Sequence, residues 1–159
     1  MASQAQSLEF SELSLAGVAL LSSLHREIFP ADTGERWQPQ DLAAILSQPT
    51  TLCLLAQLDE MPAGYALLRF IADECELLSF GVRPELRRQG IAGRLLDHSL
   101  AVCRGRGASR FFLEVREDNL PARRFYAEKG FASIGRRPGY YRGSMGQKTD
   151  AITMAFDLI

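Results

Sequence analysis

A single mixed α/β domain is the fold class that this sequence predicts. The chain has 159 residues, the length of one ordinary domain, and can therefore bury a substantial core. Its apolar periodicities predict strands and helices in the order β α α β β β α β α β β, without repeats or a linker. Apolar residues make up 47% of the chain and charged residues 23%, as in an ordinary globular protein.

The first half predicts two helices and four strands. Apolar residues recur at helical spacing from Leu15 to Ile28, and Ser14 is a suitable helix cap before them. Pro39 begins a shorter helix that ends at Pro49. Alternating or continuous apolar runs predict the strands, of which the second and third form a hairpin across a turn at residues 59–64. The expected strands are residues 7–13, 51–58, 65–71 and 75–82.

The second half predicts two helices, each preceded by a strand. A turn containing glycine leads into a helix that ends at Gly105. Asp118 or Asn119, followed by proline, begins the last helix, which ends at Gly130. The expected strands are residues 110–115, 131–136 and 151–158, and residues 137–148 are expected to form a loop rich in glycine and tyrosine.

The charge balance argues against a nucleic-acid or membrane partner. The net charge is −1, so the chain lacks the basic excess that binds nucleic acid or an anionic membrane. Arginines nevertheless gather at residues 83–94 and 104–110. They either form solvated helix faces or hold a polyanion such as a phosphorylated cofactor, and composition leaves both interpretations open.

The cysteines predict neither a metal site nor a disulfide framework. Cys53, Cys75 and Cys103 are far apart and form no CxxC motif, and the two histidines lie in unrelated segments. Cys53 lies in an apolar run and is expected to be buried. The first ten residues do not resemble a signal peptide, and no run of about 18 apolar residues occurs. We therefore expect a cytoplasmic protein.

The turn between residues 82 and 91 has the features of a phosphate site. The first N–H groups of a helix lack partners within the helix and lie at the positive end of its dipole. Glycine lets a ligand approach the backbone, and Arg87 and Arg88 add positive charge. A pyrophosphate at residues 89–93 is one interpretation, and a helix that merely begins at glycine is the other. The turn matches neither a Walker A loop nor the GxGxxG dinucleotide motif, because no lysine follows and position 92 is alanine.

Two side chains in the next segments carry chemistry. Glu114 lies on an apolar strand, where a buried carboxylate needs a partner or a raised pKa. It could instead face solvent or pair with an arginine. Tyr126 lies on a helix among apolar residues, where core packing is the more common role for tyrosine.

Together these segments resemble the GCN5-related N-acetyltransferase (GNAT) superfamily. The acetyl-CoA motif of that superfamily has Gln or Arg, two variable residues, Gly, one variable residue, then Gly or Ala; Arg87, Gly90 and Ala92 match it. The run FLEVREDNLPARRFYAEKGF, with GRRPGYY and TDAITMAFDL after it, is similar to the RimI type, whose members acetylate the N-terminal alanine of a small-subunit ribosomal protein. The resemblance implies one domain over residues 1–159, with a central, mostly antiparallel twisted sheet flanked by helices.

The resemblance also implies acetyl-CoA as co-substrate, no metal, and a role for each matching residue. Glu114 would be the general base and Tyr126 the general acid. A strand N–H near Gly81 would stabilise the oxyanion that forms from the thioester. The residues implied to contact the cofactor are Phe80, Gly81, Val82, Arg87, Arg88, Gln89, Gly90, Ile91, Ala92, Gly93 and Asn119. Tyr140 and Tyr141 would flank the acceptor.

The expected acceptor is a protein N-terminus, with a ribosomal protein among the candidates, and the enzyme is expected to be a monomer or weak dimer. Two segments depart from the RimI pattern, at residues 29–32 and 149–151, and both border the acceptor side. A small-molecule amine is therefore one alternative, although only scattered acids would line its groove, namely Asp32, Glu35, Asp41 and Glu60. A non-catalytic acetyl-CoA-binding module is another, but it would be expected to lose Glu114 and Tyr126.

Overall fold

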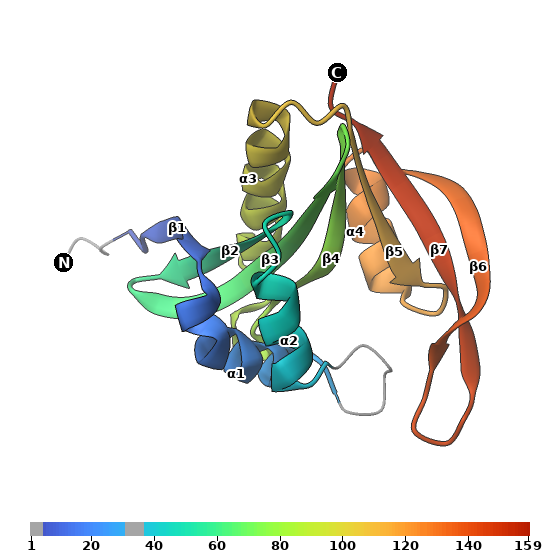
Figure 1. Ribbon diagram of the computed structural model, residues 1–159, viewed down its shortest axis with the longest axis horizontal. Coiled ribbons are helices and arrows are strands. Elements are labelled where there is room, and N and C mark those ends of the chain that lie inside the picture. Colours follow the sequence, from blue (N-terminus) through green and yellow to red (C-terminus); the bar gives the residue numbers. More distant parts are fainter. Residues whose placement is uncertain (1–4, 31–36) are drawn as a thin grey trace.

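The computed structural model describes residues 5–30 and 37–159, and within them one seven-stranded sheet carries α-helices on both faces (Figure 1). The strand order is β1-β2-β3-β4-β5-β7-β6. The strands are β1 (Leu8–Leu13), β2 (Thr51–Leu58), β3 (Met61–Ile71), β4 (Glu74–Val82), β5 (Arg110–Arg116), β6 (Ala132–Arg142) and β7 (Lys148–Asp157). The helices are α1 (Val18–Ile28), α2 (Pro39–Leu46), α3 (Ile91–Gly105) and α4 (Leu120–Glu128), and Leu15–Gly17 and Pro84–Leu86 form short 3₁₀ turns. The predicted fold class is confirmed.

Neighbouring strands are antiparallel except for β4 and β5, which are parallel and are joined by α3. A parallel pair needs such a crossover because its strands begin at the same edge of the sheet. The β4–β5 pairing extends only from Glu74 and Arg110 to Leu77 and Leu113. Beyond Leu77, β4 continues to Val82 without β5 beside it, and Figure 1 shows the two strands lying together at one end and separating towards the other. The backbone of β4 on that side is therefore available to something other than a strand.

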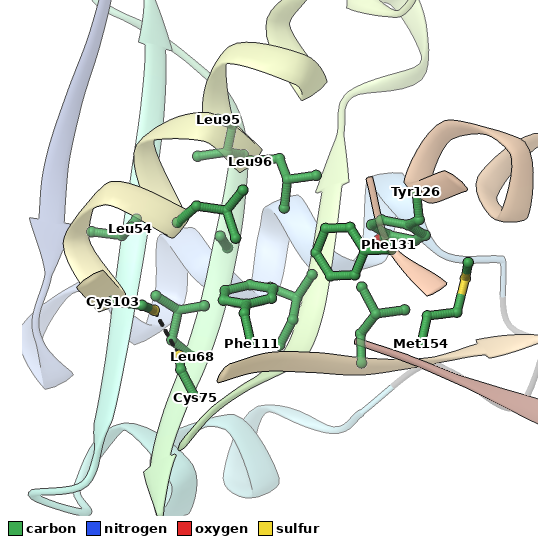
Figure 2. Close-up of a cluster of buried hydrophobic side chains, with 14 of the residues drawn as sticks. Leu54, Leu68, Cys75, Leu95, Leu96, Cys103, Phe111, Tyr126, Phe131 and Met154 are labelled. Atoms are coloured by element: carbon green, nitrogen blue, oxygen red, sulfur yellow. Dashed lines mark hydrogen bonds between the residues drawn. The ribbon is translucent and has the colours of Figure 1, made fainter. Parts of the chain in front are cut away.

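Two hydrophobic cores fix the sheet between the helices. On one face, α3 and α4 pack on the sheet around Leu96, Phe111 and Phe131 (Figure 2). On the other face, α1 and α2 pack on β2 and β3 around Leu21 and Tyr65. Because strand side chains alternate between faces, the burial of Phe111, Leu113 and Val115 against α3 and α4 turns Glu114 to the opposite face.

All three cysteines are buried, as predicted for Cys53, and none forms a disulfide. The sulfur atoms of Cys75 on β4 and Cys103 on α3 lie 2.7 Å apart, and Figure 2 marks this contact. Burial raises the pKa of the Cys53 thiol to about 12. A thiol with that pKa holds its proton at neutral pH, so Cys53 is not a nucleophile.

Several predicted boundaries were wrong, among them the first helix, which begins as α1 only at Val18 after a 3₁₀ turn, and the last strand, β7, which begins at Lys148 instead of residue 151. The turn expected at residues 59–64 is only Asp59 and Glu60, both with positive φ, and β3 already begins at Met61. Residues 137–142, expected in a loop, continue β6. The register of β6 with β7 shifts between Arg137 and Tyr141, so the two-residue alternation that indicates a strand is interrupted there.

Gly64 is a position where the sheet itself requires glycine. A Cβ added at Gly64 would lie 2.4 Å from the carbonyl oxygen of Gly81 on β4. We expect Gly64→Ala to lower the free energy of unfolding by about 1–3 kcal/mol, because β3 and β4 must move apart. Gly105→Ala is the matched control, since a Cβ there meets nothing within 4 Å. Urea unfolding of both variants tests this, and equal stability of the two would contradict it.

Candidate active site

A cavity of about 730 Å³ lies where β4 and β5 part. It is lined by the end of β4, by β5, by α4, by the end of α1 and by β6. A second cavity of about 480 Å³ lies at the N-terminus of α3. The first brings together ten of the predicted site residues: Phe80, Gly81, Val82, Arg87, Ala92, Glu114, Asn119, Tyr126, Tyr140 and Tyr141. The second adds Arg88, Gly90, Ile91 and Gly93, and Gln89 lines neither.

The turn into α3 has the backbone of an anion site. Gly90 is the N-cap of α3 and has φ +79°, which a side chain would strain, although a Cβ there would meet no atom within 4 Å. Arg88 also has positive φ, at 63°. Arg87 also has a structural role, because its guanidinium donates to the carbonyl oxygens of Val82 at 3.2 Å and Ile28 at 3.4 Å. Arg87 therefore ties the turn to β4 and α1 while its charge lies beside both cavities.

Glu114 is a buried carboxylate at the cavity wall. Its side chain is 8% exposed, and Oε1 accepts from Arg137 Nε at 2.7 Å. Oε2 is buried and has no hydrogen-bond partner within the described residues. Burial raises the pKa of Glu114, Arg137 opposes this rise, the negative charge of Glu76 adds to it, and the nearby Tyr140 hydroxyl lowers it. Glu114 is therefore both a buried carboxylate and the ion-pair partner of an arginine.

Tyr126 belongs to the core and to the cavity at once. Its ring packs against Phe131 at 5.6 Å and Phe125 at 5.2 Å between centroids. It also lines the cavity between the parted strands. Asn119 has a similar double position, because its side chain caps α4 by accepting from the Ala122 N–H at 3.2 Å and also lines the cavity.

Tyr140 and Tyr141 lie on β6 rather than in a loop, and both flank Glu114. The Tyr141 hydroxyl donates to the backbone carbonyl of Glu114 at 3.2 Å. The guanidinium of Arg137 lies 5.5 Å from the centre of the Tyr140 ring. Burial, and next the charge of Glu114, raise the pKa of Tyr140, so its hydroxyl keeps its proton at neutral pH.

Two features of the site could not be predicted from the sequence. Arg137 pairs with Glu114 from a segment that was expected to be a loop. Ser79, on the cavity wall, is hydrogen-bonded at 2.7 Å to the Tyr65 hydroxyl, which lies 2.6 Å from His25 Nδ1. His25 Nε2 accepts from the Trp37 N–H at 2.8 Å, so Nδ1 carries the ring proton of neutral His25. No local pattern connects residues 40 positions apart.

Two kinds of feature are absent from residues 5–30 and 37–159, the part of the chain that the structure describes. No three His, Cys, Asp or Glu side chains there are grouped so that they could hold a metal ion. No helix of that part is long and apolar enough to cross a membrane.

Known proteins similar to this chain are N-acetyltransferases. The family model described as the acetyltransferase (GNAT) family matches residues 19–131. The ribosomal protein bS18-alanine N-acetyltransferase of Salmonella typhimurium is 33% identical over 100 residues, which are 63% of this chain and 67% of that protein. The enzyme of the same name from Escherichia coli is 34% identical over 60% of this chain. That alignment spans 64% of the Escherichia coli protein, slightly less than two thirds of its length.

Solved structures extend the likeness over the whole chain. The crystal structure of the ribosomal-protein-S18-alanine N-acetyltransferase from Escherichia coli has a TM-score of 0.84 and 26% identity, covering 96% of this chain and 94% of that one. NAA60 from Arabidopsis thaliana in complex with acetyl-CoA has a TM-score of 0.80 and 20% identity, covering 95% and 98%. This second likeness concerns the fold alone.

Proposed function

Because this chain belongs to the acetyltransferase (GNAT) family, we propose that it transfers the acetyl group of acetyl-CoA directly to the N-terminal α-amine of a protein, preferably one that begins with alanine. The observation that carries the proposal is one cavity lined by the parted strand β4, by the Glu114 carboxylate and by Tyr126. Such a cavity can hold a thioester and an amine between a base and an acid.

The residues around the two cavities fit acetyl-CoA. The backbone of residues 80–82 on β4 has no strand partner on the β5 side and would pair with the amide groups of the pantetheine arm. The left-handed turn at Gly90 and the first N–H groups of α3 would hold the pyrophosphate. Acetyl-CoA supplies an activated acyl group as a thioester.

The chain's own residues then move the protons. The amine attacks only when neutral, and an α-amine has a pKa of about 7.7–8.0, so part of it is already neutral at neutral pH. Glu114 Oε2 would accept a proton either from an amine that is still protonated or from the nitrogen as it attacks. A β4 N–H near Gly81 would stabilise the thioester oxygen as negative charge forms on it. As the C–N bond forms and the C–S bond breaks, Tyr126 would give its proton to the leaving thiolate. Solvent then restores the Tyr126 proton and removes the one on Glu114.

The positions of the acidic side chains favour a peptide acceptor over a polycationic small molecule, because the described ones either lie away from the cavity or are paired with arginine. Asp41 accepts from the Gln38 N–H at 3.1 Å at the start of α2, and Glu60 lies in the β2–β3 turn, so neither lines the cavity. Glu76 is paired with Arg69, and Glu114 with Arg137. Asp32 and Glu35 lie outside the described residues. The cytoplasmic location and the monomer or weak dimer stay predictions.

The test is release of free thiol from acetyl-CoA in the presence of a panel of amines. The decisive pair is an unblocked peptide beginning with alanine and an N-terminally blocked peptide that carries a lysine. Peptides beginning with Ser, Met or Gly, spermidine and an aminoglycoside complete the panel. We expect turnover on the unblocked alanine peptide and none on the blocked one. Turnover on spermidine or the aminoglycoside alone would replace the peptide by a small amine, and binding of acetyl-CoA without any turnover would indicate a non-catalytic module.

A further inference from the structure

The two oxygens of Glu114 lie in different surroundings. Oε1 is held by Arg137 Nε at 2.7 Å, whereas Oε2 is buried and accepts no hydrogen bond within the described residues. A buried acceptor without a partner costs free energy, so an orphan of this kind in a cavity wall points to a ligand group that completes it. Arg137 thus engages the oxygen that the acceptor amine does not need.

We propose that Arg137 is a positioning residue that keeps the Glu114 carboxylate ionised and holds it with Oε2 directed to the acceptor. This inference rests on the proposed function. Burial of the Glu114 side chain, which is 8% exposed, raises the pKa of its carboxyl group, and a positive neighbour opposes this rise by stabilising the charged form that accepts a proton. Arg137 touches no reacting atom, because its contact is with the opposite oxygen.

The sheet register explains why Arg137 can reach Glu114. On β7, Thr153 pairs with Glu114 of β5 on one side and with Gly135 of β6 on the other. Arg137 lies two residues along β6 from Gly135 and therefore on the same face, opposite Ala151. Since Ala151 and Thr153 are short, the Arg137 side chain can cross β7 above them. A longer side chain at position 151 would obstruct this path.

Arg136 shows that the contact is specific to one arginine of the pair. It points to the other face and binds Glu117 at 2.7 Å and Asp150 at 2.9 Å. Arg136 has no contact with Glu114 in the structure, although it is adjacent in sequence to Arg137. The two arginines therefore form a matched pair, with the same charge and different targets.

The other titratable groups around Glu114 come from four elements. Glu76 on β4, Tyr126 on α4, and Tyr140 and Tyr141 on β6 line the same cavity. Arg116, on β5 itself, is directed to Asp118 at 3.0 Å. Among the charges that act on the Glu114 carboxyl, Glu76 favours its neutral form, and Arg137 is the cation that opposes this. Removing Arg137 therefore leaves Glu114 beside a like charge in a desolvated position, with the Tyr140 hydroxyl as the remaining neighbour that lowers its pKa.

The experiment compares Arg137→Gln, Arg137→Lys and Arg136→Gln with the unmodified protein in two measurements. The first follows the Glu114 carboxyl by ¹³C NMR of protein labelled at the glutamate side-chain carboxyl, with Glu114→Gln identifying the resonance. The second is the pH dependence of kcat/KM for acetyl transfer to the alanine peptide. We expect Arg137→Gln to move the Glu114 titration and the acid limb of the profile upward by about one to three pH units. Arg137→Lys should recover part of this shift, and Arg136→Gln should change neither.

The NMR titration tests the role of Arg137, and the kinetic measurement tests the proposed acetyl transfer, so failure of one can be told from failure of the other. An unchanged Glu114 titration in Arg137→Gln would overturn the role of Arg137, whatever the activity. A shifted titration in a protein that acetylates none of the amines would support the ion-pair control and reject the proposed function. An equal shift in Arg136→Gln would also overturn the inference, because general surface charge would then be the cause.

Discussion

Glu114→Gln is expected to reduce kcat/KM for the alanine peptide by about 10²–10⁴, the usual contribution of a positioned base. Glutamine keeps the shape of the side chain and can still contact Arg137, but its amide cannot accept a proton at neutral pH. The loss should be greatest at pH values between the pKa of Glu114 and that of the amine, about 7.7–8.0. Above this window the amine is already neutral and Glu114 is needed only for the proton of the attacking nitrogen, and below it Glu114 is itself protonated, so the loss becomes smaller on both sides.

The control for Glu114→Gln is Glu117→Gln. Glu117 is half-buried and pairs with Arg136, and it does not line the cavity, so its substitution removes a nearby negative charge without changing the cavity wall. We expect its pH profile to match that of the unmodified protein. A loss in Glu114→Gln that is the same at every pH would show that the carboxylate acts through structure or binding and not as a base.

Tyr126→Phe should lower kcat by about 10²–10⁴ while leaving the affinity for acetyl-CoA nearly unchanged. The phenyl ring can keep the packing of Tyr126 against Phe125 and Phe131, so the cavity wall stays in place. Only the hydroxyl that would protonate the leaving thiolate is removed. Initial-rate kinetics measure the first effect, and isothermal titration with acetyl-CoA measures the second.

Two results would count against the role of Tyr126 as an acid. Unchanged turnover would remove the hydroxyl from the mechanism. A loss of acetyl-CoA affinity together with a lower melting temperature would mean that the substitution had disturbed the core, since Tyr126 is part of it. We expect Tyr126→Phe to have a lower kcat and an unchanged melting temperature.

The prediction of the fold succeeded where local signals are strong. Proline and glycine mark helix ends by restricting or freeing φ, and the structure begins α2 at Pro39 and ends α3 at Gly105 as expected. The apolar run at residues 110–115 predicted a strand, and β5 confirms it with an alternation of burial that turns Glu114 to the face opposite Leu113 and Val115. The end of β6 was missed, because residues 137–142 lack an apolar run and the register of β6 with β7 shifts after Arg137.

For the candidate site too, some features were predictable from the sequence and others were not. The sequence by itself determined the glycine turn before α3, where Gly90 has the positive φ that glycine favours, and its family resemblance predicted the pair Glu114 and Tyr126, which the structure places at one cavity. Only the tertiary structure decided that β4 and β5 part after Leu77 and that Arg137 reaches Glu114 across β7. The physical reason is that these contacts join segments distant in the chain. Strand register, short side chains and burial in three dimensions create them, and none of these is a property of neighbouring residues.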